Sequence, residues 1–152
     1  MCVHEAGHLV AACAFHWPIL WAEITPEGGE VRSKGPRLEG LTRGQRFAQR
    51  SVSAISGCMA EAILSGEDWS EIMASHRSSG GKGLVDSDNL AEALGMAGQV
   101  VADPQMLMLA AEKSEAMLRV NWELVRTFAA LLDQRSYLPG REVWQIVESL
   151  RR

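Results

Sequence analysis

The sequence lacks any apolar run long enough to cross a membrane. Its longest such run, residues 9–15, is far shorter than the roughly 20 residues that a membrane-spanning helix needs. No Lys or Arg precedes this run, and two histidines and a glutamate stand immediately before it, which argues against a secretory signal peptide. We therefore expect a protein with no membrane span.

Cysteine is scarce as well, and neither sign of charge is in large excess. The three cysteines, Cys2, Cys13 and Cys58, are an odd number without paired spacing. This pattern argues against a disulfide framework and favours free, buried thiols in a reducing, cytoplasmic location. The net charge is only −4, with acidic and basic residues interspersed, so we do not expect nucleic acid or a membrane surface as a partner.

The chain does contain enough apolar material for one core. With 152 residues, 47% of them hydrophobic, it is predicted to form a single domain over residues 1–152. Residue spacing predicts a mainly α fold with a small β strand or hairpin after the first helix. The strand and turn are expected over 19–33. The expected helices are 3–15, 45–64, 69–75, 88–101, 105–135 as one long helix or two in line, and a short one after residue 140.

Two stripes of side chains recur at helical spacing. One is apolar and is expected to be core: Met106, Leu109, Met117, Val120, Leu124, Phe128 and Leu131. The other is basic, with Arg43, Arg46 and Arg50 on one helical face. It could meet an acidic partner, but a solvated face is the favoured interpretation.

The motif that carries chemistry is His4-Glu5-Ala6-Gly7-His8. On a helix, His4 and His8 lie one turn apart on the same face, so both can bind one zinc ion, with Glu5 beside them without binding it. Such an ion lowers the pKa of its bound water toward about 7, the glutamate takes the proton, and the resulting hydroxide can attack an amide carbonyl. Glu5 could then return the proton to the leaving amine. The alternative is two polar residues that fall near a helix start by chance.

A third ligand separates the known classes of such enzymes. Metzincins place a Gly and a His at the positions that Ala11 and Ala14 occupy here, so this class is excluded. Thermolysin-like enzymes use a downstream helical glutamate, but the carboxylates at that distance fall in the predicted strand and turn: Glu23, Glu27 and Glu30. The more distant candidates are Glu61, Asp86 and Asp88.

Several further segments follow the motif in a fixed order. "WAEITPEGG" is similar to a strand followed by a Pro-Gly turn, "SGCMAEAILSG" to a Gly-Arg-x-Ala-Glu-Glu helix, and "VDSDNLAEAL" to a Ser-x-Asp or Ser-Asp helix start. "NWELVRTFAALLDQRSYLPGREVWQIV" contains a Leu-x-Gly-x-Glu turn. With the zinc motif, this series resembles the peptidase domain of the FtsH-type ATP-dependent zinc metalloproteases over most of the chain. It departs from that family at Cys58 and Ala62, which stand where the family has Arg and Glu.

The resemblance implies site residues and a function. It implies His4, His8 and Asp88 as zinc ligands and Glu5 as the base. Asp86 is the rival third ligand, because the spacing fits either aspartate with a shift of one residue; Asp88, preceded by Ser87, is favoured. Glu61 matches a family position close to the zinc and is expected to orient a ligand histidine, the alternative being a solvated helix glutamate. His16 and His76 are expected to be surface or loop histidines.

The family carries a transmembrane segment and an ATPase module ahead of the peptidase domain, and this chain has neither. It begins at the zinc helix, where family members have preceding residues, which leaves two interpretations open: a truncated N-terminus, or a site without part of its usual support. We expect a stand-alone zinc endopeptidase for flexible or unfolded polypeptide, held along an edge strand near residues 19–25. A separate ATPase partner and a homo-oligomer are compatible with the resemblance. The alternative is a catalytically inactive, zinc-stabilised module that binds polypeptide.

Overall fold

The computed structural model describes residues 2–78 and 104–151 and confirms a mainly helical fold with a small antiparallel sheet. In chain order the described elements are α1 (Cys2–Ala14), β1 (Ile19–Thr25), β2 (Gly28–Ser33), α2 (Arg43–Ser65), α3 (Trp69–Ser78), α5 (Pro104–Val120), α6 (Trp122–Arg135), β3 (Tyr137–Pro139) and α7 (Gly140–Leu150). Residues 105–135 were predicted to form one long helix or two in line, and they form the two helices α5 and α6. The helix predicted over 88–101 lies outside the described residues.

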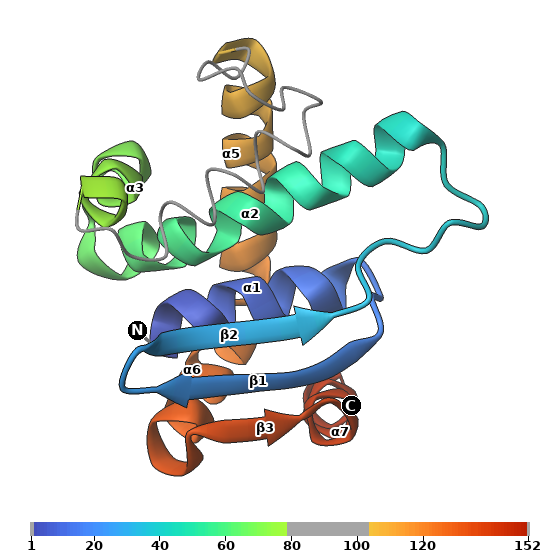
Figure 1. Cartoon of the computed structure of the whole chain (residues 1–152), viewed down its shortest axis with the longest axis vertical. Helices are drawn as coiled ribbons and strands as arrows, with labels where there is room; N and C mark the ends of the chain where they lie inside the picture. Colours follow the sequence, from blue (N-terminus) through green and yellow to red (C-terminus); the bar gives the residue numbers. More distant parts are fainter. Residues whose placement is uncertain (1, 79–103, 152) are drawn as a thin grey trace.

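Helix α1 is the centre of the molecule. Nine of its thirteen residues are buried, and they lie on all sides of the helix rather than on one stripe. A helix that is covered all round must be packed on several faces. Helix α1 packs against α2, α6 and the sheet, and Figure 1 shows it between α2 and strand β2. The zinc motif therefore lies in the most enclosed helix of the described structure.

The sheet has the strand order β2-β1-β3, and both pairings are antiparallel. Strand β1 is thus the central strand, so the expectation that residues 19–25 form an edge is wrong. Strand β2 is the edge strand that lies next to α1 (Figure 1). Strand β3 pairs with β1 on the side opposite β2 and so makes β1 central. It was not predicted, because a segment of three residues that includes a proline shows no alternation of apolar and polar residues.

Helix α2 begins two residues before the predicted range 45–64 and ends one residue after it, with Gly66 at its end as predicted. The Thr42 side chain accepts a hydrogen bond from the Gln45 N–H (3.1 Å), and the Gln45 side chain accepts one from the Thr42 N–H (2.8 Å), which forms a capping box. At the other end, Gly66 adopts a left-handed conformation with φ 78° and closes the helix.

Part of the apolar stripe predicted over residues 106–131 is not core. Leu124 and Phe128 are buried, but Met106 and Leu109 are each 45% exposed and Val120 is 86% exposed. Helix α5 instead buries small residues together with Leu118, and Ser114 hydrogen-bonds to Ser56 of α2 (3.0 Å). Helix α5 ends at Val120 and α6 begins at Trp122, so the helical spacing of the apolar residues does not continue from one helix into the next.

Two findings bear on the compartment and membrane expectations. Cys13 and Cys58 are buried, as predicted, whereas Cys2 is only partly buried. Burial raises the pKa of the Cys13 thiol to about 12. In the described part of the chain, no helix has the length and apolar character needed to cross a membrane.

The crossing of α1 and α2 is unusually close because Gly7 has no side chain. A Cβ atom at Gly7 would overlap the carbonyl oxygen of Ser56 and lie 2.9 Å from the Cβ of Ala60. Such contacts are below the distance at which carbon atoms pack, so the two helices would have to separate. Gly7 thus sets the distance between the zinc motif and α2.

Gly7→Ala is expected to lower the free energy of unfolding by about 1–3 kcal/mol, since overpacking forces the backbone to shift. Urea unfolding followed by circular dichroism measures this change. Gly44→Ala is the matched control, because a Cβ atom at Gly44 meets only the Thr42 hydroxyl at 3.9 Å. It should leave stability unchanged or raise it by up to about 1 kcal/mol. Equal effects of both substitutions would refute the close-crossing argument.

Candidate metal centre

The two histidines of the motif face each other at one point. They extend from successive turns of α1, and their Nε2 atoms lie 3.2 Å apart. Two nitrogen ligands at 2.0–2.1 Å from a tetrahedral zinc ion lie about 3.3–3.4 Å apart. The spacing of His4 and His8 therefore fits two ligands of one ion.

The other nitrogen of each ring is held by an oxygen from α2. The Nδ1 atom of His8 lies 2.8 Å from the backbone carbonyl oxygen of Ser53, and that of His4 lies 3.0 Å from Oε2 of Glu61. A carbonyl and an ionised carboxylate only accept hydrogen bonds, so both Nδ1 atoms donate. In a neutral ring the lone pair is then on Nε2, which is the arrangement that metal-binding histidines require.

Gly57 of α2 provides the space in front of these two atoms. A Cβ atom at this position would lie 2.5 Å from Nε2 of His4 and 2.6 Å from Nε2 of His8. Any other residue would thus place a methyl or methylene group between the two nitrogens. The donor set and the absence of a side chain at Gly57 together fit a zinc ion.

Glu5 lies on the side of α1 that faces the sheet. Its side chain is 2% exposed, and a Cβ atom on Gly29 would lie 2.8 Å from both the carboxyl carbon and Oε1 of Glu5. Glu5 thus packs directly against the backbone of edge strand β2. With His4 and His8 it lines a pocket of about 550 Å³, whose walls come from α1, β2, the segment after β2, and α2. This volume is typical of a ligand site.

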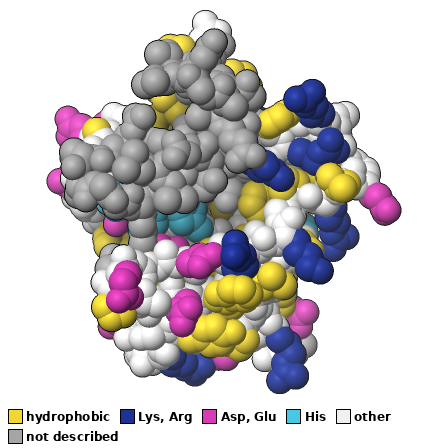
Figure 2. Space-filling view, viewed as in Figure 1, with side chains coloured by type: hydrophobic (Ala, Val, Ile, Leu, Met, Phe, Trp, Pro, Cys, Tyr) yellow, Lys and Arg dark blue, Asp and Glu magenta, His cyan; other side chains and the backbone are white. Residues whose placement is uncertain are grey.

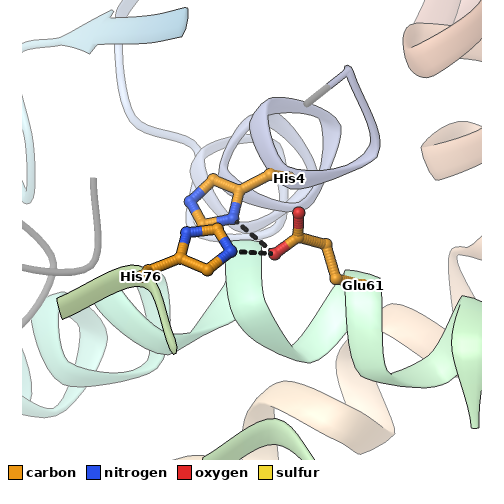
Figure 3. Close-up of side chains that lie close together, drawn as sticks. All are labelled: His4, Glu61 and His76. Carbon is orange, nitrogen blue, oxygen red and sulfur yellow. Dashed lines mark hydrogen bonds and ion pairs between the residues drawn. The ribbon is translucent and has the colours of Figure 1, made fainter. Parts of the chain in front are cut away.

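A second cluster shares His4 with the pair just described. Oε2 of Glu61 also lies 3.3 Å from Nε2 of His76, and the rings of His4 and His76 stack with centroids 5.3 Å apart. Figure 3 shows these three side chains coming from α1, α2 and α3. One ligand atom from each lies within 4.8 Å of the others, so the group His4, Glu61 and His76 can hold a metal ion.

This cluster corrects one expectation and confirms another. His76 is not a surface or loop histidine: it lies in α3 and is partly buried against Glu61, whereas His16 is exposed. No local sequence pattern indicated that His76 would lie near His4. The two residues are brought together by the turn after Gly66, where the chain reverses and α3 comes back towards α1. The predicted contact of Glu61 with a motif histidine is confirmed.

The electrostatics of Glu61 favour its charged form. Burial acts to raise its pKa, but the hydrogen bond from His4 and the attraction of His4 and His76 outweigh burial. The pKa of Glu61 therefore lies below its ordinary value. At neutral pH Glu61 is a carboxylate, which supports its role as acceptor of the His4 Nδ1 proton.

The predicted third ligand, Asp88, and its rival, Asp86, lie outside the described residues. Comparison with known proteins adds no assignment: no family model matches the chain, and no curated protein matches it significantly. The site is therefore interpreted from its own geometry.

Two substitutions distinguish the two positions that an ion can take. If the ion is bound by Nε2 of His4 and His8, His8→Ala should reduce zinc affinity by more than the 10–100-fold typical of an outer partner, and His76→Ala by at most about tenfold. Competition with a fluorescent zinc chelator measures both affinities, and circular dichroism checks the fold. The reverse order would assign the ion to His4, Glu61 and His76.

Glu61→Gln should lower zinc affinity by about 10–100-fold, because the amide can accept the His4 Nδ1 proton but carries no negative charge to polarise the ring. The same chelator competition measures the loss. Glu67→Gln is the control, since this exposed glutamate just past the end of α2 should leave affinity unchanged. An unaltered affinity in Glu61→Gln would contradict the orienting role.

Proposed function

We propose that this protein is a zinc-dependent endopeptidase. The observation that supports it best is the convergence of the His4 and His8 Nε2 atoms beside a buried carboxylate, Glu5, in one pocket. Two neutral imidazoles and an adjacent base are the groups that metal-assisted amide hydrolysis requires. The resemblance to FtsH-type peptidase domains supports the same conclusion.

The proposal assigns a task to each residue. His4 and His8 hold the ion, and Asp88 completes the ligand set, with Asp86 as the alternative. When bound, zinc supplies Lewis acidity, which acidifies water and polarises the scissile carbonyl. Glu5 accepts the proton of the attacking water on its carboxylate and delivers it to the leaving amine nitrogen. Glu61 and the Ser53 carbonyl keep the two imidazoles in the required tautomer.

Strand β2 is the proposed place for the substrate backbone. It is an edge strand, and residues 29–33 line the pocket together with Glu5. An exposed edge pairs with an extended chain through main-chain hydrogen bonds, which do not depend on sequence. Only a flexible or unfolded segment can adopt that form, so unstructured polypeptide is the proposed substrate.

Glu5→Gln should lower kcat/KM for an unstructured protein by about 10²–10⁴-fold, because the amide cannot accept the proton. Zinc content should stay that of the wild type, since Glu5 is not assigned as a ligand. Cleavage is followed by gel and mass spectrometry, with bound zinc measured in the same samples. Glu27→Gln, at the exposed turn between β1 and β2, is the matched control.

Two outcomes would count against the proposal. Unchanged cleavage by Glu5→Gln would remove the base from the mechanism. Zinc binding without cleavage in either protein would favour an inactive, zinc-stabilised module that binds polypeptide. The cluster of His4, Glu61 and His76, which joins three helices, is the feature that favours this second function.

A further inference from the structure

Three basic side chains line the pocket that contains Glu5. Arg32 and Lys34 contribute from the end of β2 and the residue after it, and Arg50 contributes from α2. Trp17 forms part of the same wall and is anchored by a hydrogen bond from its indole N–H to Gln49 (2.9 Å). The candidate metal centre and this basic wall therefore line a single pocket.

The local charge contrasts with that of the whole protein. Residues 31–50 contain six basic residues and one acidic residue, which gives a local charge of +5, whereas the chain as a whole carries −4. Figure 2 shows Lys and Arg side chains gathered where β2 ends and α2 begins, on a face where histidine is also visible. The charged residues that line the pocket are three basic ones and the acidic Glu5 and Glu30, which leaves a positive excess. A positive excess attracts ligands of negative charge.

Most of these charges are not neutralised by acidic partners. Arg32 has an ion pair with Glu30 (3.4 Å), but both side chains are more than half exposed. Within residues 2–78 and 104–151, no carboxylate forms an ion pair with Lys34 or Arg50. Arg46 donates to the carbonyl oxygens of Leu38 and Leu41, which orients its guanidinium without cancelling the charge.

The spacing along α2 relates this wall to the candidate metal centre. Arg50 precedes Gly57, which faces the two Nε2 atoms, by seven residues. Seven residues span about 10 Å of an α-helix. An extended chain advances about 3.3 Å per residue, so the same distance corresponds to about three residues of a bound peptide.

We propose that the basic wall is a specificity subsite for acidic side chains of the substrate, about three residues from the scissile bond. The inference rests on the proposed endopeptidase function and extends it. Asp or Glu at that distance would meet Arg50 and Lys34, while the substrate backbone lies along β2. Partly exposed ion pairs of this kind each change affinity by about two- to fivefold.

The first test is binding, which does not depend on cleavage. The zinc-loaded Glu5→Gln protein is titrated with unstructured fluorescent peptides that carry Glu pairs on one side of a neutral centre, or Gln at the same positions. The Glu peptides should bind about three- to tenfold more tightly at low salt, and the difference should vanish near 1 M salt, where charges are screened beyond about 3 Å. Equal binding of Glu and Gln peptides would overturn the subsite.

The second test uses wild-type cleavage of the same peptides. The ratio of kcat/KM for Glu and Gln peptides should exceed three in the wild type and fall to about one in Arg50→Gln/Lys34→Gln. It should stay at the wild-type value in Arg126→Gln, which removes an exposed arginine of α6 outside the pocket. A ratio that does not respond to Arg50 and Lys34 would refute the assignment.

The two tests separate this inference from the proposed function. Selective binding of Glu peptides without cleavage by the wild type would support the subsite and contradict the peptidase. Cleavage of both peptides at equal rates would support the peptidase and contradict the subsite. Displacement of the Glu peptides by a single-stranded oligonucleotide of equal charge at equal concentration would assign the wall to nucleic acid and overturn the inference.

Discussion

The close crossing of helices α1 and α2 is the contact on which the rest of the structure depends. It is possible because two glycines face it: Gly7 lies against the backbone of α2, and Gly57 lies against both motif histidines. The same contact brings the Ser53 carbonyl to His8 and the Glu61 carboxylate to His4. Buried imidazoles and carboxylates are costly unless they are hydrogen-bonded. The contact that packs the core therefore also satisfies, and orients, the polar groups of the candidate metal centre.

His4 shows how tightly these roles are linked. Its ring is 1% exposed, and its two nitrogens point to different neighbours: Nε2 to His8 and Nδ1 to Glu61. Glu61 also lies within ion-pair distance of His76 from α3. The ring of His4 is therefore fixed from three helices, which reduces the reorganisation needed for an ion to bind at Nε2. A site held in this way on regular helices is more precise than one built from loops.

Sequence reasoning predicted the parts of the site that depend on local periodicity. A helix over the motif places His4 and His8 on one face whatever the rest of the chain does, and Gly66, the predicted end of α2, is a local signal as well. The contact of Glu61 was predicted from a family resemblance. The Ser53 carbonyl, the approach of His76 and strand β3 were not predicted, because a backbone oxygen has no residue signature and the other two depend on chain reversals. The prediction of which α5 residues are buried was wrong in part. The helix buries mainly small residues, whereas Met106 and Met108 are exposed.

One face of α2 unites these features. Arg50, Ser53, Gly57 and Glu61 follow one another at spacings of three or four residues, so they form a single row along the helix. In that order the row offers a cation, a carbonyl acceptor, a gap without a side chain and a carboxylate acceptor. The Glu61 carboxylate and the Ser53 carbonyl contact the motif histidines, Gly57 faces both of them, and Arg50 lies about two turns before Gly57. In the proposed scheme, metal affinity and substrate preference are set by different positions of the same helix, so a substitution of Arg50 is expected to leave in place the contacts that orient His4 and His8.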